Sequence, residues 1–178
     1  MTDPDHFGAL KPQLYTDAER QRRDSSPWTL VQGILAPVQF IIFLVSLGLV
    51  MRTLMTGEGV FAAHLSILAK TLALYTIMIT GCIWEKVVFG RYLFAPAFFW
   101  EDVFSMLVLA LHTAYLVALF NGAMTVREQM VLALAAYAAY AINAAQFLLK
   151  LRAARLQAEA EAADQIEQPV EPSSGVTA

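Results

Sequence analysis

Three carboxylates lie next to a run of aromatic residues in the middle of this chain. Glu85 lies near the start of the run, and Glu101 and Asp102 end it. Seven aromatic side chains accompany them, at Trp84, Phe89, Tyr92, Phe94, Phe98, Phe99 and Trp100. Carboxylic acids that are partly removed from water beside aromatic rings can act as proton donors near neutral pH. Because rings of this kind can also cover a flat apolar ligand, the stretch indicates acid–base chemistry on a large conjugated molecule.

The three acids do not have equal access to one site. Neighbours on a helix point about 100° apart, so we expect one of Glu101 and Asp102 to face the site. The other should face solvent or the basic residues Lys86 and Arg91. His112 lies within about 20° of Glu101 around the same helix. It is therefore a candidate ligand or proton-transfer group, with a neutral core histidine as the alternative.

Composition indicates an integral membrane protein. The 178 residues are 58% hydrophobic with a mean hydropathy of +0.54, and only 15% are charged. A soluble domain carries about a quarter charged residues. The single cysteine, Cys82, excludes an intramolecular disulfide, and no cluster has the spacing of metal ligands. We therefore expect no metal or cofactor of the protein's own, a lipid bilayer as partner, and no nucleic-acid partner.

Four apolar segments are long enough, at about 20 residues, to cross a membrane. They cover approximately residues 28–51, 61–88, 102–120 and 130–149. Ser26 can cap the first segment with Pro27 at its first helical position, and Gly90 should stop the second. The pattern predicts an all-α bundle of four transmembrane helices over residues 27–150.

The distribution of Lys and Arg predicts the orientation of the bundle. Nine basic residues lie in three regions: the N-terminal arm, the central connection and the segment after the fourth helix. The other two connections carry only Arg52 and Arg127. The positive-inside rule then places both termini and the aromatic connection in the cytoplasm.

The two ends of the chain have their own patterns. Residues 1–26 form a basic arm in which Thr16 and Glu19 predict the capping box of a short surface helix. The fourth helix should continue through the Ala/Glu-rich stretch to about Gln165. The last segment, residues 151–178, therefore begins with this helical extension. It should end in a disordered acidic tail, which contains Pro169, Pro172 and residues 173–175.

A polar layer crosses the four predicted helices. Gln39, Tyr75, His112 and Tyr140 lie at a similar depth, and Asn143 lies one turn closer to the cytoplasm. Such residues face the bundle rather than lipid, and their plain interpretation is hydrogen bonding between helices. Lys70 also lies inside the second helix, and we expect its side chain to extend outward along the helix to the membrane surface.

A specific family pattern runs through the central stretch. The segment Thr71–Tyr115, with Trp84-Glu85-Lys86 followed by Phe98-Phe99-Trp100-Glu101-Asp102, resembles the 3-vinyl (or 2-vinyl) bacteriochlorophyllide hydratase family. Trp28-Thr-Leu-Val-Gln-Gly33, followed by Ala36-Pro37, resembles the N-terminal signature of the same family. The resemblance covers about residues 15–150. It implies hydration of the C3 vinyl group of chlorophyllide a, or of its bacteriochlorophyllide counterpart, to a 1-hydroxyethyl group.

The implied reaction gives the candidate residues specific tasks. We expect Glu85 or Glu101 to protonate the vinyl group, and Asp102 or the other acid to position water. His112 is the candidate ligand of the substrate's magnesium, or a proton relay. The residues expected to contact the macrocycle are Trp84, Phe89, Phe94, Phe98, Phe99 and Trp100, together with Tyr75. Because adding water changes no redox state, the resemblance implies no added cofactor.

Other interpretations use the same residues. Trp84, Tyr92 and Trp100 can serve only as interfacial anchors, since Trp and Tyr accumulate at membrane surfaces. A carrier or assembly protein that binds a chlorophyllide without altering it needs the same aromatic rings. A small transporter is disfavoured because the chain shows no inverted repeat. The resemblance further implies an inner or intracytoplasmic photosynthetic membrane, with other bacteriochlorophyll-biosynthesis enzymes as partners.

Overall fold

The computed structural model describes residues 14–167, and the side chains of residues 14–160. These residues form five helices and no strand: α1 (Asp17–Ser25), α2 (Pro27–Thr56), α3 (Val60–Phe89), α4 (Phe99–Asn121) and α5 (Val126–Glu167). The predicted acidic tail, from residue 168 onward, and Lys11 of the basic arm lie outside the described residues.

Local sequence signals set several of the helix ends. Thr16 and Glu19 form the predicted capping box of α1, with Thr16 N donating to Glu19 Oε2 at 2.8 Å. Ser26 caps α2 with Pro27 in the first turn, as predicted. α3 ends at Gly90, whose φ of 78° lies in the left-handed region that favours glycine. The chain therefore leaves α3 in a new direction one turn after Glu85.

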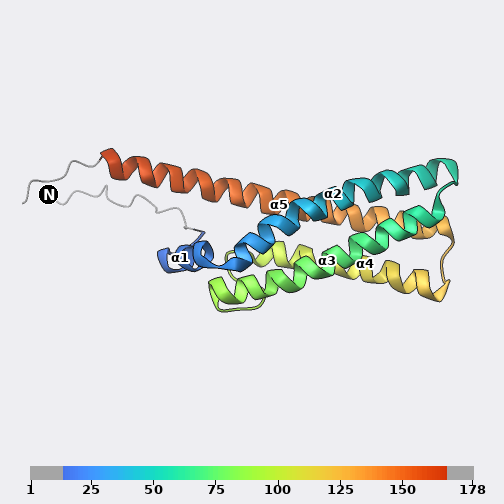
Figure 1. Ribbon diagram of the computed structural model, residues 1–178, viewed down its shortest axis with the longest axis horizontal. Coiled ribbons are helices and arrows are strands. Elements are labelled where there is room, and N and C mark those ends of the chain that lie inside the picture. The colour runs from blue at the N-terminus through green and yellow to red at the C-terminus, as the bar shows by residue number, and fades with distance from the viewer. Residues whose placement is uncertain (1–13, 168–178) are drawn as a thin grey trace, which may run out of the picture.

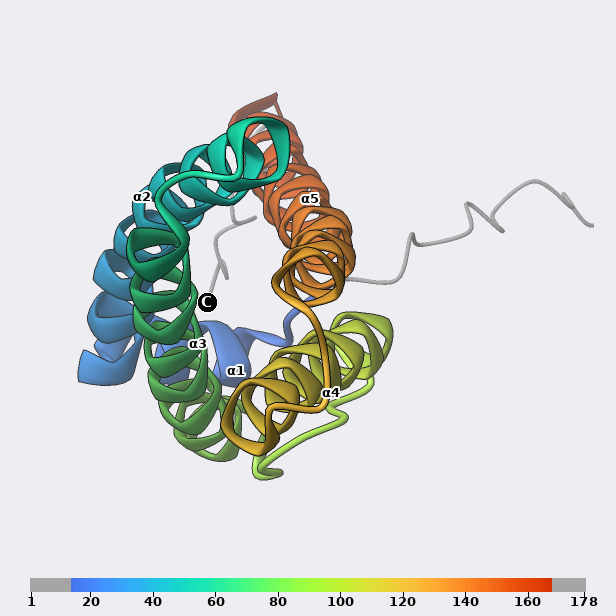
Figure 2. The same cartoon turned by 90° about the vertical axis from the view of Figure 1, so that its right-hand side faces the viewer.

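The four long helices form a ring in the order α2, α3, α4, α5 (Figure 2). α2 packs mainly on α3 and α4 mainly on α5, with smaller contacts from α2 to α5 and from α3 to α4. α1 lies against one end of this ring and contacts α3 (Figure 1). The α3–α4 connection, residues 90–98, lies at the same end, and α5 extends past it (Figure 1). We call this the α1 end.

The outer surface of the ring is apolar. Large hydrophobic side chains such as Leu30 and Ile41 of α2, Leu72 of α3 and Phe120 of α4 are exposed. All four long helices have the length and hydropathy needed to cross a membrane. Contiguous apolar surface of this extent on the outside is covered by lipid. The protein is therefore an all-α, multi-pass membrane protein.

Polar side chains join the helices inside the ring. Ser46 of α2 contacts Tyr137 of α5 with 2.5 Å between the hydroxyl oxygens. Asn143 Nδ2 of α5 donates to Ser105 Oγ of α4 at 2.8 Å. The Tyr75 hydroxyl of α3 lies 2.8 Å from that of Thr113 of α4, at an exposed position between these two helices. The predicted interhelical role of Tyr75 and Asn143 is confirmed.

The expectation for Lys70 was wrong. Its side chain is fully buried, and its Nζ lies 3.5 Å from the centre of the Tyr140 ring on α5. Lys70 therefore points into the bundle instead of along α3 to the membrane surface. Among the described side chains its Nζ has no hydrogen-bond partner. The sequence placed Lys70 on α3 but did not show which side of the helix faces α5.

Replacing Lys70 should make the bundle more stable. Lys70→Met keeps most of the side-chain volume and removes a buried amine that lacks a hydrogen bond. We expect the free energy of unfolding to rise by about 1 kcal/mol, measured by denaturant unfolding in detergent. Arg52→Met, at an exposed pair with Glu58, is the control and should change little. A lower stability for Lys70→Met would show that the amine makes a stabilising contact.

Candidate functional site

The three carboxylates meet at the α1 end of the bundle. Glu85 lies in the last turns of α3, and Glu101 and Asp102 lie in the first turn of α4. Because the 90–98 connection is short, it brings these two helix ends together. All three acids are buried. Carboxylates at the start of α4 also interact favourably with the helix dipole.

Glu85 and Asp102 form a direct pair. Their carboxyl groups lie close enough to share a hydrogen bond, which forms only when one of the two holds a proton. Phe94 N donates to Asp102 Oδ2 at 2.7 Å, whereas Ala95 N donates to Glu85 Oε2 at the longer distance of 3.4 Å. The shorter backbone bond favours the anion on Asp102. Glu85 is therefore the partner that carries the shared proton.

The same pair shapes the α3–α4 connection. Phe94 has a φ of 59°, the only positive φ of a non-glycine residue in the described part of the chain. Such a conformation costs of order 1 kcal/mol or more and persists only where the surroundings hold it. The hydrogen bonds that Phe94 N and Ala95 N donate to the two carboxyl groups stabilise this backbone conformation. The acids and the connection therefore fix each other's position.

Glu101 has a different partner. Its Oε2 lies 2.6 Å from Lys150 Nζ of α5, and Lys150 also donates to the backbone oxygen of Ala97. The prediction that one of Glu101 and Asp102 faces solvent, Lys86 or Arg91 was wrong, because both are buried and Lys86 bonds Gly90 O instead. The predicted divergence of the two neighbours does occur. Asp102 points to α3 and Glu101 to α5.

The aromatic residues divide into two groups. The inner group is Trp84, Phe89 and Phe98, packed with Tyr15 and Phe147. Tyr15 stacks on Phe89 with ring centres 5.7 Å apart, and Trp84 meets Phe98 edge-on at 5.7 Å. Trp84 Nε1 is further fixed by a 2.9 Å bond to Thr29 Oγ1 of α2. This group is a packed cluster that links α3, α5 and the segment before α1.

The outer group faces away from the bundle. Phe94, Phe99 and Trp100 are exposed and contact each other in sequence, with ring centres 5.7 Å and 5.5 Å apart. Tyr92 is exposed as well and lies under Lys86. The predicted macrocycle-contacting residues therefore do not form one surface, because three of the seven pack in the inner group and three lie in the outer group.

His112 and Tyr75 do not join the acids. His112 is eleven residues after Glu101 on α4, which separates them by about 16 Å along the helix. It is fully buried, and its Nδ1 lies 2.8 Å from Val108 O. Tyr75 is ten residues before Glu85 on α3, about 15 Å away. His112 and Tyr75 therefore lie about three helical turns from the acids.

A second set of polar groups lies one turn deeper than the acids. Ser105 follows Asp102 by one turn of α4 and accepts the bond from Asn143. Asn143 Oδ1 and Gln146 Oε1 are buried and lack a hydrogen-bond partner among the described side chains. Gln146 also lies one turn before Lys150 on α5. Two open acceptors therefore lie beside the Glu101–Lys150 pair.

A cavity of about 570 Å³ opens beside Lys150, the partner of Glu101. It lies between α5, the 90–98 connection and the segment before α1. We call it the Lys150 cavity. Its volume lies within the range of about 300–1,000 Å³ found for small-molecule and cofactor sites. Phe89, Pro96 and Ala97 provide its apolar wall. The lining is completed by Leu14, Glu19, Lys150, Ala153, Ala154 and Gln157.

Comparison with known proteins identifies the family. The sequence profile described as 2-vinyl bacteriochlorophyllide hydratase matches residues 15–153. This chain belongs to that family. The protein of that name from Rhodobacter capsulatus is 71% identical over 148 residues, which cover 83% of this chain and 86% of the relative. The one from Cereibacter sphaeroides is 68% identical over 148 residues, covering 83% and 92%. No solved structure matches.

The hydratase match includes the three acids and the residues that contact them. Residues 15–153 contain Tyr15, α1, the three acids and Lys150. Sequence analysis found the acids but missed Lys150, Tyr15 and Gln146 as parts of the site. The sequence did contain one signal for Lys150. This basic residue directly follows the fourth apolar segment, and Glu101 directly precedes the third, so both lie at the same depth in the membrane. Tyr15 gave no comparable signal, since it lies outside the apolar segments.

The Glu101–Lys150 pair should behave as a coupled unit. Lys150→Met leaves a buried carboxylate without its cation, so we expect the free energy of unfolding to fall by about 2–3 kcal/mol. Adding Glu101→Gln to that variant should restore most of the loss. Denaturant unfolding of the single and double variants measures the coupling. Arg152→Met, at an exposed site on the same helix, is the control. A double variant as unstable as Lys150→Met would contradict the pairing.

Proposed function

We propose that this protein hydrates the vinyl group of a chlorophyllide-type magnesium chlorin to a 1-hydroxyethyl group, at the α1 end of the bundle. The relatives of this family are named for the same reaction on a bacteriochlorophyllide. The observation that carries the proposal is the buried Glu85–Asp102 pair under the 90–98 connection, whose Pro96 and Ala97 also line the Lys150 cavity together with Phe89. Either chlorophyllide a or its bacteriochlorophyllide counterpart presents the same vinyl group.

The first step is protonation of carbon. A vinyl group is a poor electrophile, so water adds only after a proton has been delivered. Glu85 donates its proton to the terminal CH2, whose π electrons form the new C–H bond. The remaining cation lies on the carbon next to the ring, where macrocycle conjugation stabilises it. The carboxylate left on Glu85, and the anion of Asp102 beside it, stabilise that cation further.

Water then adds to the cation. A lone pair of the water oxygen forms the C–O bond, and one proton of the water passes to Glu101, which Lys150 keeps as a carboxylate until this point. The open acceptors Asn143 Oδ1 and Gln146 Oε1 position the attacking water. Return of the proton from Glu101 to Glu85 restores the resting state. The reaction consumes one water and needs no redox partner.

The aromatic groups support this reaction in different ways. Phe89 lines the Lys150 cavity and offers a stacking surface for the macrocycle, with Trp84 and Tyr15 holding it in place. Ala95, which donates to Glu85, is followed directly by Pro96 and Ala97 of the cavity wall. We propose that the strained connection at Phe94 moves on binding and admits the vinyl edge to Glu85. The exposed Phe99 and Trp100 anchor the connection at the membrane surface.

The surroundings of the reaction follow from charge and chemistry. The excess of Lys and Arg at the α1 end favours a cytoplasmic location for this end and for both termini. The magnesium arrives with the substrate, so we propose no cofactor of the protein's own. We further propose an inner or intracytoplasmic photosynthetic membrane, where other enzymes of bacteriochlorophyll biosynthesis supply the chlorin and receive the product.

Glu85→Gln tests the acid directly. The amide oxygen can still accept the bond from Ala95 N, but the side chain cannot donate an acidic proton. We expect kcat to fall at least about 100-fold, with the affinity for pigment unchanged. Mass spectrometry of vinyl chlorophyllide incubated with purified protein measures the gain of one water, and pigment absorbance measures binding. Glu58→Gln, an exposed acid at the opposite end, is the control.

Two results would overturn the proposal in different ways. Full activity of Glu85→Gln would contradict its role as the acid. Binding of pigment by the wild-type protein with no gain of water would instead favour a carrier or assembly protein. Accumulation of vinyl pigments in cells that lack the protein separates these cases independently, because a carrier that leaves the vinyl group intact would not cause it.

A further inference from the structure

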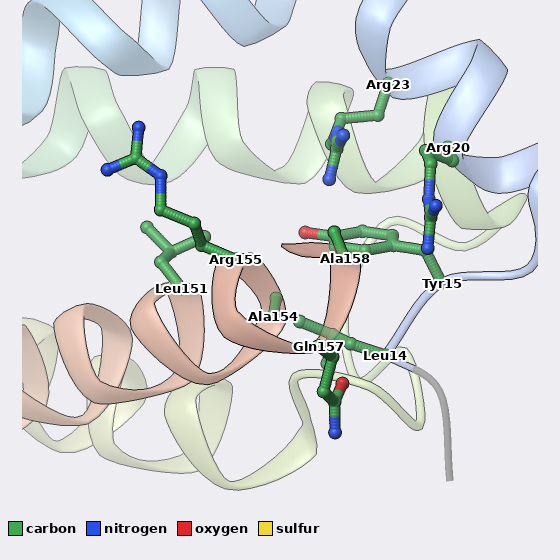
Figure 3. Close-up of a pocket in the computed structure, with 9 residues that line it drawn as sticks. All are labelled: Leu14, Tyr15, Arg20, Arg23, Leu151, Ala154, Arg155, Gln157 and Ala158. Carbon is green, nitrogen blue, oxygen red and sulfur yellow. The ribbon is translucent and has the colours of Figure 1, made fainter. Parts of the chain in front are cut away.

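A second cavity, of about 290 Å³, continues from the Lys150 cavity toward α1 and the extension of α5 (Figure 3). The two cavities share the lining residues Leu14, Ala154 and Gln157, so one ligand can occupy both. Arginines from two helices line the second cavity: Arg20 and Arg23 from α1 and Arg155 from α5. None of its described lining side chains is acidic. We call it the arginine cavity.

Tyr15 forms the floor of the arginine cavity, and its position is fixed by packing. Tyr15 is buried and stacks on Phe89 with ring planes 15° apart, so the floor is continuous with the wall of the Lys150 cavity. The guanidinium of Arg23 lies 4.7 Å from the centre of the Tyr15 ring. In Figure 3 the side chains of Arg20 and Arg23 both extend from α1 toward Tyr15. The capping box of Thr16 and Glu19 fixes the helix that carries them.

The charge of the arginine cavity favours an anion. Glu19 accepts from Thr16 N. Asp24 accepts from Nε and Nη2 of Arg23 at 2.8 and 2.7 Å, so it already occupies one edge of that guanidinium, and the three arginines still outnumber it. Arg155 is exposed on α5, at the opposite side of the cavity from α1. Burial raises the pKa of Tyr15, so its hydroxyl remains a hydrogen-bond donor at neutral pH. A ligand here meets donors and positive charge from two helices.

The proposed substrate carries a matching group. A chlorophyllide has a free propionate carboxylate, which is esterified with a long alcohol in the corresponding chlorophyll. The propionate and the vinyl group lie on different rings of the macrocycle. Binding the propionate away from the acids would therefore also orient the vinyl edge. Arginine is the side chain best suited to a carboxylate, because its planar guanidinium donates two parallel hydrogen bonds.

We propose that the arginine cavity binds the propionate carboxylate of the chlorin while the macrocycle lies in the Lys150 cavity with its vinyl edge toward Glu85. This inference rests on the proposed function. It makes Arg23 and Arg155 the residues that distinguish a chlorophyllide from an esterified chlorophyll.

The test compares two substrates and two variants. Full-length protein in nanodiscs of neutral phosphatidylcholine is assayed with vinyl chlorophyllide and with its propionate methyl ester. The wild type should show a KM at least about tenfold lower for the free acid, with similar kcat for both. In Arg23→Gln/Arg155→Gln the KM for the free acid should rise about tenfold, while the KM for the ester stays within about twofold. Arg152→Gln, exposed outside the cavity, should behave as wild type.

Arg155→Gln alone should give a smaller shift in the same direction, and it keeps the test valid if the double variant folds poorly. Equal KM values of the wild type for acid and ester would overturn the proposal. So would an equal loss for both substrates in the variants, which would indicate that the arginines serve only the packing of this end of the bundle. Equilibrium pigment binding, followed by absorbance, makes the same comparison without turnover. A wild type that binds the acid selectively but hydrates neither compound would contradict only the proposed function.

Discussion

The hydrogen bond between the Glu85 and Asp102 carboxyl groups is the interaction on which the site depends. It joins the last turns of α3 to the first turn of α4, the two long-helix neighbours with the least contact elsewhere. The same carboxyl groups accept backbone bonds from Phe94 and Ala95 and hold the positive φ of Phe94. One buried contact thus positions a proton, shapes the connection that covers it and closes the ring of helices at this end.

Environment gives chemically similar acids different states. Glu101 is one residue from Asp102, but the 100° step around the helix directs it to α5, where Lys150 compensates its charge. Asp102 points to α3 and meets another acid, so a proton must be retained there. A buried pair that shares a proton beside a carboxylate that stays ionised provides an acid and a base within one turn of helix. The general rule is that two carboxyl groups take opposite roles when their surroundings differ.

Much of the architecture could be predicted from the sequence. Four apolar segments, the cap at Ser26 and Pro27, the capping box at Thr16 and the stop at Gly90 depend on local signals, and the structure contains them. The burial of Glu85, Glu101 and Asp102 at one end of the bundle is consistent with their positions around one short connection. The resemblance indicated the family that the comparisons then confirmed.

The partners of side chains could not be predicted in the same way. Lys70 turned inward and Lys150 paired with Glu101 because of how α3, α4 and α5 are rotated against each other, which a single sequence does not encode locally. The division of the aromatic residues has the same origin. Phe98 and Phe99 are adjacent in sequence, yet one packs inside against Phe147 and the other faces outward. Tyr15 reached the site only through the packing of α1.

Infrared spectroscopy of the purified resting protein at neutral pH tests the central claim most directly. A shared proton on Glu85 requires the carbonyl stretch of a protonated carboxylic acid, a band that shifts in heavy water. This band should appear in the wild type and in Glu101→Gln, and it should be lost in Glu85→Gln. A wild-type spectrum without the band, or a band that persists in Glu85→Gln, would contradict that claim.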